Sequence, residues 1–436
     1  MMEQKQDSSH AALLRVKSWL RKMESLSLPE QCRMQESQLK LLFNHASNCS
    51  AWWRNRLSQA GYLWQEGSLF TLLERLPPLL RSDVQEHFEE MRAWRDDWSA
   101  KDIFTSTTSG STGMPVRVEK FSAAFNLLYG ALSLIDHEWH GRDASLPLVI
   151  LGAKADSIQP DWGPLFAPFQ GRGSVLIRYA SSRSMQDHAA WLLEHQPAYL
   201  KVAPSRAASI AEELLQQGIT LPLRQIISQT ERVTPHQREV CRKAFGAEIV
   251  DRYSCEECGW LALQCPQHEH LHVMAGTTIL EIVDEDLNPC PPGVAGRVLV
   301  TSLQSYAMPL IRYDIGDIAE WGEACDCGNR LPVIKRLWGR RRNLVRLPGG
   351  ELRPAPFFGD DVAKIEIIRE FRLVQQINGE IDFFVRAPRP LSGEEVEALW
   401  SIILKMDAPL VLHIHEVACI DWGTGLKREE FVRLES

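Results

Sequence analysis

The chain has few of the features that mark secreted, membrane-spanning or fibrous proteins. No window of its 436 residues approaches the ~20 consecutive apolar residues of a membrane span. Acidic and polar residues interrupt the first segment, "MMEQKQDSSHAALLRVKSWL", where a signal peptide would be apolar throughout. Low-complexity runs are lacking, and 44% hydrophobic with 24% charged residues is the composition of a folded protein. We therefore expect a cytoplasmic protein with no membrane partner.

An excess of positive charge is also lacking. The formal net charge is -8 at pH 7, whereas a protein that binds nucleic-acid phosphates needs clustered cations. The basic run "GRRRN" at residues 339–343 is interpreted as a solvated loop. We therefore expect no nucleic-acid partner.

A disulfide framework is not expected in such a chain. Cysteines that cluster in a cytoplasmic protein indicate metal binding or catalysis. Five of the ten cysteines form two clusters, in "YSCEECGWLALQC" at residues 253–265 and in "ACDCGN" at residues 324–329. The other five lie apart and are expected to be plain thiols: Cys32, Cys49, Cys241, Cys290 and Cys419.

The length and the periodicity of the chain predict an α/β protein of two or three domains. Residues 38–98 repeat apolar side chains at helical spacing, which predicts an opening helical segment. From there to about residue 262, β-rich runs alternate with amphipathic stretches. This alternation favours a mainly parallel, helix-covered sheet with ligands at the carboxyl ends of its strands. Extended runs around a Pro/Gly turn predict an antiparallel β subdomain at 266–336. We place a boundary between residues 340 and 341, before a small α+β domain.

The stretch "TTSGSTGMP", at residues 107–115, is the most specific signal in the sequence. Its glycines and hydroxyl side chains allow a flexible loop to wrap backbone N–H groups and Oγ atoms around phosphate oxygens. The GKS or GKT of a Walker P-loop is missing. A Ser/Thr/Gly linker remains the alternative interpretation.

Two later motifs follow this loop along the chain. "YSCEE" places Glu257 four residues after Tyr253, and "AMPLIRYDIGD" ends in Asp317. Together with the loop, they resemble the ANL superfamily of adenylate-forming enzymes, and in particular its phenylacetate-CoA ligase branch. The resemblance extends to "LERLPPLLRSDVQEHF", "LHVMAGTTILEIVD" and "KRLWGRR", and covers about residues 38–345.

This resemblance implies a fold and a two-step reaction. The fold is a large N-terminal adenylating domain, residues 1–340, followed by a small mobile lid domain, residues 341–436. In the reaction, a carboxylate attacks the α-phosphate of ATP to give acyl-AMP and pyrophosphate. A thiol, usually that of coenzyme A, then takes the acyl group. The branch implies that the acid is aromatic.

The resemblance also assigns roles to single residues around the nucleotide. Glu257 would hold Mg²⁺, a hard cation that prefers carboxylate oxygen. Tyr253 would stack on adenine, with Glu231 of "SQTE" on the other side. Asp317 would accept hydrogen bonds from the ribose hydroxyls, and Arg336 would reinforce that contact. The β- and γ-phosphates would lie in the Ser/Thr/Gly loop, against Thr108, Ser109, Gly110, Ser111, Thr112 and Gly113.

Three positions depart from the family pattern. Met114 stands where the loop usually has a lysine, and Arg342 stands where an acidic hinge residue is expected. The C-terminal lysine, here Lys427 in "TGLKREEF", is displaced by one residue. In the family this lysine contacts the carboxylate and the α-phosphate during adenylation. The departures keep open a pseudoenzyme that binds nucleotide without turnover.

The branch also implies a structural zinc site. Members with a "CxCG" sequence carry a cysteine after the glutamate loop and a histidine in an "LH" strand start. The matching residues here are Cys265, His272, Cys325 and Cys327, and three thiolates with one imidazole suit tetrahedral zinc. His268 is the rival fourth ligand. A competing set pairs Cys255 and Cys258 with Cys325 and Cys327, on spacing alone.

Substrate and partners are less constrained by the sequence. Pocket walls in this family come from strand ends, here near residues 152–156, 201–205 and 228–230. Coenzyme A is the expected acceptor, and an acyl carrier protein or a reductase is the alternative. A homodimer is a further expectation. A zinc-bearing interaction module is the rival from another class of protein.

Overall fold

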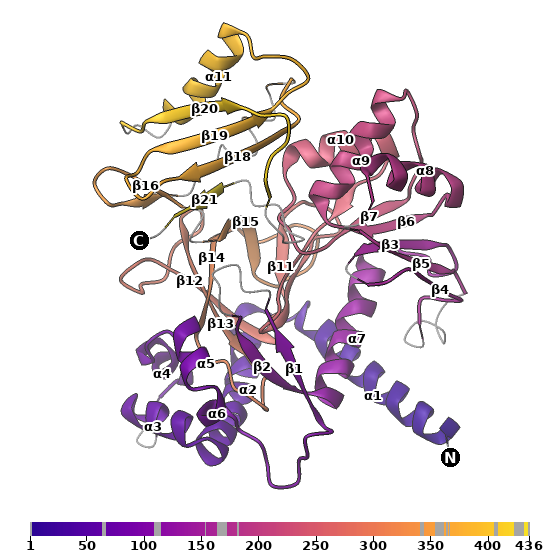
Figure 1. Cartoon of the computed structure of the whole chain (residues 1–436). Coiled ribbons are helices and arrows are strands. Elements are labelled where there is room, and N and C mark those ends of the chain that lie inside the picture. The colour runs from indigo at the N-terminus through magenta and orange to yellow at the C-terminus, as the bar shows by residue number, and fades with distance from the viewer. Residues whose placement is uncertain are drawn as a thin grey trace. The chain divides into compact units, whose positions relative to one another are not determined.

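The computed structural model describes most of the chain: residues 2–62, 67–108, 115–152, 154–163, 172–180, 183–340, 344–353, 362, 365, 367–404, 409–422 and 431–434 (Figure 1). Within these residues, no helix is both long and apolar enough to cross a membrane. The chain divides into two compact units. The first unit joins Met1–Arg142 to Arg252–Leu337, and the second joins Asp143–Asp251 to Trp338–Ser436.

Helices open the first unit. The backbone N–H of Ser27 donates to Glu30 Oε2 at 2.8 Å, one half of a capping box that begins α2. The Oγ atom of Ser50 accepts from the N–H of Trp53 and so begins α3. The helices of this unit are α1 (Met2–Met23), α2 (Leu28–Cys49), α3 (Ala51–Gln59), α4 (Leu69–Arg75), α5 (Arg81–Glu86), α6 (Phe88–Met91) and α7 (Ser122–Trp139).

Two sheets complete the first unit. Strands β1 (Ile103–Thr107) and β2 (Arg117–Phe121) form an antiparallel pair on either side of the Ser/Thr/Gly loop. The larger sheet has seven strands in the order β12-β13-β14-β15-β11-β10-β9. Their bounds are β9 (Arg252–Cys255), β10 (Gly259–Gln264), β11 (Leu271–Val273), β12 (Thr278–Val283), β13 (Ala295–Ser302), β14 (Tyr313–Trp321) and β15 (Val333–Arg340).

One hydrophobic core joins the helices of this unit to its large sheet. Phe43 of α2 and Trp53 of α3 are fully buried in the same cluster as Leu310 and Tyr313. The buried guanidinium of Arg312 donates to the carbonyl oxygens of Glu74 and Leu76. These hydrogen bonds fix the start of β14 against the end of α4. Burial of the large apolar side chains stabilises the same arrangement, because it is the main source of folding free energy.

The second unit contains a six-stranded sheet in the order β4-β5-β3-β6-β7-β8. All neighbours are parallel except β4, which runs antiparallel to β5. Apolar side chains of the strands pack against α8, α9 and α10 in a second core, and Figure 1 shows these three helices beside the sheet. The bounds are β3 (Leu148–Gly152), β4 (Ser157–Gln159), β5 (Val175–Tyr179), α8 (Met185–His195), β6 (Tyr199–Val202), α9 (Pro204–Gln216), β7 (Gln225–Ser228), α10 (Pro235–Phe245) and β8 (Ile249–Val250).

The C-terminal part of the second unit has its own small core, which includes Leu373, Phe383 and Leu399. Its four strands lie in the order β20-β19-β18-β21, with β18 and β19 antiparallel and both edge pairs parallel. The elements are β16 (Val345–Arg346), β17 (Leu352–Arg353), β18 (Glu370–Gln375), β19 (Ile381–Arg386), α11 (Gly393–Leu404), β20 (Leu412–Glu416) and β21 (Phe431–Arg433).

The predicted α/β fold class is confirmed, and so are the parallel sheet and the antiparallel β segment. The helical segment differs in extent, since helices begin at Met2 and α2 begins at Leu28, well before residue 38. One of the β-rich runs expected before residue 262, "AEIVDRYS" at residues 247–254, is not one strand. It divides into β8 of the parallel sheet and β9 of the antiparallel sheet, with Asp251 between them. The proposed lid boundary at residues 340 and 341 stays a prediction.

Candidate functional site

The turn between β9 and β10 carries Glu257. Cys255 pairs with Gly259 across the hairpin, so residues 256–258 form the turn. Gly259 has φ +80°, a conformation that disfavours any residue with a Cβ atom. Glu256 is exposed, whereas only 5% of the Glu257 surface is accessible. The hairpin therefore directs one of its two adjacent glutamates into the protein.

Tyr313 of β14 holds the Glu257 carboxylate. Its hydroxyl donates to Glu257 Oε1 at 3.2 Å, and both residues are buried. Burial raises the pKa of Tyr313 above its usual range, and the nearby Glu257 charge adds to this shift. The phenol is therefore a hydrogen-bond donor at neutral pH, and the other carboxylate oxygen can bind a cation such as Mg²⁺.

Tyr253 and Asp317 form a second buried pair. The Tyr253 hydroxyl donates to Asp317 Oδ2 at 2.8 Å. Asp317 lies within an irregularity in the pairing of β13 with β14, between Asp314 and Ile318, where Gly316 has φ +75°. Such a bulge re-aims the side chains that it contains. The motifs "YSCEE" and "YDIGD" are thus joined through a hydrogen bond between residues 64 positions apart.

Thr108 lies where β1 ends and the Ser/Thr/Gly loop begins. Its Oγ1 atom accepts from the N–H of Val116 at 2.9 Å and from a guanidinium nitrogen of Arg81 at 3.3 Å. Arg81 is the first residue of α5. A cation is therefore fixed at the start of the loop, although Met114 takes the place of the family's loop lysine. Residues 109–114, which include Ser109, Gly110, Ser111, Thr112 and Gly113, lie outside the described residues.

Lys120 of β2 is buried behind the same turn. Its Nζ atom donates to the backbone oxygen of Glu256 at 2.5 Å and to Ser106 Oγ at 3.3 Å. The ammonium group also lies 4.6 Å from the centre of the Phe125 ring. Burial lowers the pKa of Lys120, and the neighbouring Glu256 opposes that shift.

A cavity opens beside Lys120 within the first unit. Phe125 and Tyr129 of α7 contribute one wall, and Trp260 of β10 continues it. The Tyr129 and Trp260 rings meet edge to face at 5.0 Å between centroids. Cys258 and Gly259 line the side next to the Glu257 turn. Apolar side chains of Phe121, Leu128 and Leu132 also line it, and neutral hydroxyl and amide side chains complete the lining: Thr277, Thr278, Ser302, Gln304 and Ser305.

The other proposed nucleotide residues lie elsewhere in the chain. Glu231 belongs to the second unit, where its Oε2 atom accepts from the N–H of Ser205 at 3.2 Å. Arg336 lies on β15 of the first unit and is half-buried. Arg342 and Lys427 lie outside the described residues.

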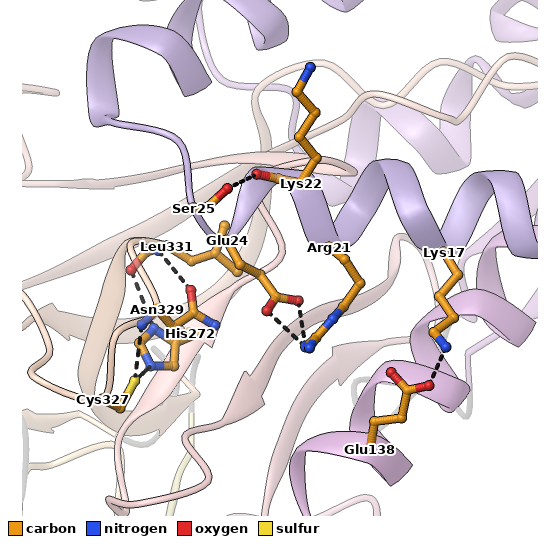
Figure 2. Close-up of polar contacts among 10 residues, drawn as sticks. All are labelled: Lys17, Arg21, Lys22, Glu24, Ser25, Glu138, His272, Cys327, Asn329 and Leu331. Carbon is orange, nitrogen blue, oxygen red and sulfur yellow. Dashed lines mark hydrogen bonds and ion pairs between the residues drawn. The ribbon is translucent and has the colours of Figure 1, made fainter.

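Four further residues bring their ligand atoms together on the large sheet. Cys265, His272, Cys325 and Cys327 place three Sγ atoms and one imidazole nitrogen within 4.8 Å of one another. His272 Nδ1 lies 3.3 Å from the carbonyl oxygen of Leu331, so this nitrogen is the donor (Figure 2). Nε2 then presents its lone pair to Cys327 Sγ at 3.4 Å. Fixing the tautomer in this way is typical of metal-binding histidines.

Backbone donors surround the sulfur atoms of this cysteine–histidine cluster. The N–H of Gln267 donates to Cys265 Sγ, and the N–H groups of Cys327 and Asn329 donate to Cys325 Sγ and Cys327 Sγ, all at 3.4 Å. Burial raises the pKa of Cys265 and of Cys325, and these backbone hydrogen bonds oppose that rise because they favour the thiolate. The donor set and its closed arrangement fit tetrahedral zinc.

The rival ligands are placed differently. His268 bonds the Asp326 carboxylate at 2.6 Å and groups with Cys325 and Asp326 alone. Cys255 and Cys258 join no group of three possible ligands among the described residues. Their own contact is local, since the N–H of Cys258 donates to Cys255 Sγ at 3.3 Å.

Sequence reasoning missed four residues of these sites. Arg81 lies in the quoted stretch "LERLPPLLRSDVQEHF", in which no single residue was assigned a role. Tyr313 lies in "AMPLIRYDIGD", of which only Asp317 was assigned a role. Lys120 is an isolated lysine on a strand. His270, whose Nε2 lies 3.1 Å from Cys325 Sγ, stands between two histidines that were considered. The repeated "HxHxH" pattern at residues 268–272 was the available signal for it.

No protein-family model matches the chain. The phenylacetate-coenzyme A ligase of Thermus thermophilus is 22% identical over 371 residues, which cover 83% of this chain and 81% of that protein. The ligase of the same name from Pseudomonas putida is 23% identical over 384 residues, covering 83% and 82%.

Solved structures agree with these relatives. The crystal structure of 2-hydroxyisobutyryl-CoA ligase in the postadenylation state matches with a TM-score of 0.74 at 17% identity, covering 95% of this chain and 92% of that one. The same ligase in complex with 2-HIB-AMP and CoA matches with a TM-score of 0.62, at 17% identity and the same coverage. The resemblance drawn from the motifs is thereby confirmed: the chain is a distant homologue of the phenylacetate-coenzyme A ligases and has the fold of the adenylate-forming ANL enzymes.

Proposed function

We propose that the chain is an AMP-forming acid–thiol ligase that activates a carboxylic acid with ATP and transfers the acyl group to coenzyme A. The observation that carries this proposal is the pair of buried hydrogen bonds Tyr313–Glu257 and Tyr253–Asp317. They gather the two family motifs in one unit with Thr108. The named relatives are phenylacetate-coenzyme A ligases, which supports an aromatic acid as the substrate.

In the first step, a carboxylate oxygen attacks the α-phosphorus of ATP and the bond to pyrophosphate breaks. Negative charge on the phosphates must be neutralised for this displacement. Glu257, oriented by Tyr313, would hold Mg²⁺ against the phosphate oxygens. Thr108, with residues 109–113, would bind the β- and γ-phosphates, and Arg81 would supply positive charge that the loop lacks at Met114.

The remaining residues would bind the nucleoside. Tyr253 would stack on adenine, and its hydrogen bond to Asp317 would fix the orientation of both side chains. Asp317 would accept from the ribose hydroxyls, with support from Arg336. Glu231 would line the far side of the base.

In the second step, the thiol sulfur attacks the acyl carbonyl carbon, and AMP leaves with the bridging oxygen. Coenzyme A is the proposed acceptor, because the structural neighbour was solved in complex with 2-HIB-AMP and CoA. An acyl carrier protein or a reductase would be revealed by acyl-AMP that forms but does not react with coenzyme A. The ten cysteines are all free thiols, which supports a cytoplasmic setting.

Lys427 would act in the first step alone, as the lysine of a mobile lid at residues 341–436. Replacing Lys427 with alanine should slow acyl-AMP formation and largely spare thioester formation from preformed acyl-AMP. The two steps are measured separately, one in reactions started with acid and ATP and the other in reactions started with preformed acyl-AMP and coenzyme A. Equal loss in both half-reactions would contradict the lid assignment.

The cysteine–histidine cluster would hold a structural zinc ion. Cys265, His272, Cys325 and Cys327 would be its four ligands, and no open position would remain for substrate. When bound, the ion would tie the end of β10 and the start of β11 to the segment before β15. Its contribution would be to stability, since closed sites of this kind add to folding free energy.

Carboxylate-dependent exchange of pyrophosphate into ATP tests the proposed function. We expect exchange with at least one aromatic acid, and we expect it to require both the acid and Mg²⁺. Exchange with no acid of a broad panel, despite tight ATP binding, would favour a nucleotide-binding pseudoenzyme. Zinc binding without any nucleotide binding would favour an interaction module.

A further inference from the structure

The cavity beside Lys120 carries charge of one sign. Among the residues that line it, Lys120 is the one cation, and none is a carboxylate. The rest are aromatic, aliphatic, thiol, hydroxyl or amide groups. A low-dielectric cavity with a single cation in its lining favours an anionic ligand, because burial has removed the Lys120 charge from water and the nearby Glu256 and Glu257 charges offset the resulting fall in its pKa only in part.

The Lys120 ammonium has a donor to offer such a ligand. An ammonium carries three N–H bonds, and in the described residues two oxygen acceptors face it, the Glu256 carbonyl oxygen and Ser106 Oγ. Both acceptors are neutral. The Phe125 ring, which lies 4.6 Å from Nζ, adds only a cation–π contact. The third N–H is therefore left for a ligand in the cavity.

The aromatic wall indicates the body of this ligand. Phe125 and Tyr129 are four positions apart on α7, so both face one side of that helix. Their rings lie 6.0 Å apart, and Tyr129 continues to Trp260. Such a wall favours a flat apolar group, because aromatic rings pack in offset or edge-to-face contacts.

The position of Lys120 indicates which end of the ligand it would meet. Its hydrogen bond to the Glu256 carbonyl places the ammonium against the turn that carries Glu257. Cys258 and Gly259, the next two residues, line the cavity. A carboxylate bound to Lys120 would thus lie at the side of the cavity that is nearest the proposed metal ligand.

We propose that Lys120 binds the carboxylate of the acid that the protein activates, while Phe125, Tyr129 and Trp260 bind its aromatic body. This inference rests on the proposed ligase function and names a substrate-binding cation for it. It departs from the expectation of pocket walls near residues 152–156, 201–205 and 228–230, none of which lines this cavity. Lys120 holds the acid before ATP reacts, which positions the attacking oxygen and favours the charged acid over uncharged analogues. Arg81 would supply the positive charge that the phosphate loop lacks at Met114, whereas Lys120 would bind the carboxylate of the acid. The two cations therefore have separate tasks.

Equilibrium dialysis on the full chain tests the inference without requiring turnover. The probes are labelled benzoate, phenylacetate and hexanoate, with neutral phenylacetamide as a matched analogue, each with and without ATP. Lys120→Met should weaken binding of the preferred acid by about 10- to 100-fold, as expected for the loss of a hydrogen bond to a charged group. Binding of phenylacetamide should be nearly the same in both proteins.

Two further variants separate charge from folding. Lys120→Gln keeps a donor for the Glu256 carbonyl and removes the charge, so it should resemble Lys120→Met in acid binding while it preserves the circular dichroism spectrum. Lys101→Met removes an exposed lysine near β1 and should bind acid as the unchanged protein does. If Lys120→Met does not fold, the Gln variant decides the question.

The outcomes distinguish this inference from the function on which it rests. No binding of any acid, or equal acid binding with and without the Lys120 charge, overturns the inference. If pyrophosphate exchange proceeds in that case, the ligase function stands without it. Acid binding that depends on Lys120 supports the inference, and a lack of exchange on the same preparation then counts against the ligase function alone.

Discussion

The two ends of β10 carry different chemistry. Before Gly259, the hairpin turn presents a carboxylate that pairs with the hydroxyl of Tyr313. After Gln264, Cys265 joins a cluster of thiols and imidazole that backbone N–H groups surround. The six residues of the strand separate these groups by about 20 Å. A short stretch with three cysteines and two glutamates therefore belongs to two sites.

The two regions differ in whether their ligand atoms remain available to a substrate or a diffusible ion. The Glu257 carboxylate keeps oxygen lone pairs for a diffusible cation and its phosphates. In the cysteine–histidine cluster, the tautomer of His272 is set and four ligand atoms converge, which leaves no role for a substrate. The first region is suited to binding and release, and the second is suited to holding the fold. Mutations should separate them.

The largest effect is expected from Glu257→Gln. The amide should weaken the hold on Mg²⁺ and cut pyrophosphate exchange by at least ~100-fold. Zinc content and melting temperature should stay near those of the unchanged protein. Glu256→Gln is the matched control, because Glu256 is the exposed neighbour in the same turn, and it should retain activity. Equal losses in the two variants would remove the distinction between the glutamates.

Cys327→Ser should lower zinc content and thermal stability and largely spare activity, the reverse of what is expected for Glu257→Gln. Losing one of four ligands should lower bound zinc from about one ion per chain to well below that, and the melting temperature should fall by roughly 5 °C or more. Activity per folded molecule should change far less than in Glu257→Gln. Metal analysis with a thermal melt checks this, and full retention of zinc would show that the cluster is not the site.

Tyr313→Phe should produce an intermediate effect on the first region. The change removes the donor to Glu257 Oε1 and adds no bulk, so about 1 kcal/mol of positioning should be lost, or roughly a fivefold decrease in exchange. The KM for Mg²⁺–ATP should rise more than the KM for the acid. A rise confined to the acid would place Tyr313 in the acyl pocket instead.

The smallest effect is expected from Cys258→Ser. Cys255 and Cys258 form a local pair in the turn and share no metal-like group with Cys325 and Cys327 in the described part of the chain. Zinc content should therefore be unchanged. A loss of zinc equal to that in Cys327→Ser would favour the ligand set that spacing alone suggests.

Local patterns and the family resemblance predicted the elements better than the contacts among them. The alternating β-rich runs located β3, β5, β6 and β7, because each of these strands is buried between its neighbours and so has a short, mostly apolar sequence. The division of "AEIVDRYS" between two sheets was not visible, because pairing partners are set by tertiary structure. The contact of Arg81 with Thr108 spans 27 positions, and no periodicity reports it. The ligand cysteines were identified through resemblance, whereas His270 was found only from its distance to Cys325.

The central claim, that a carboxylate oxygen attacks the α-phosphorus of ATP, can be tested with an acid labelled in both carboxylate positions with heavy oxygen. After one full reaction with ATP and coenzyme A, mass spectrometry locates the label. The proposed mechanism predicts one heavy oxygen in AMP, since AMP leaves with the bridging atom, and none in pyrophosphate. Heavy oxygen in orthophosphate, with ADP as the nucleotide product, would contradict it.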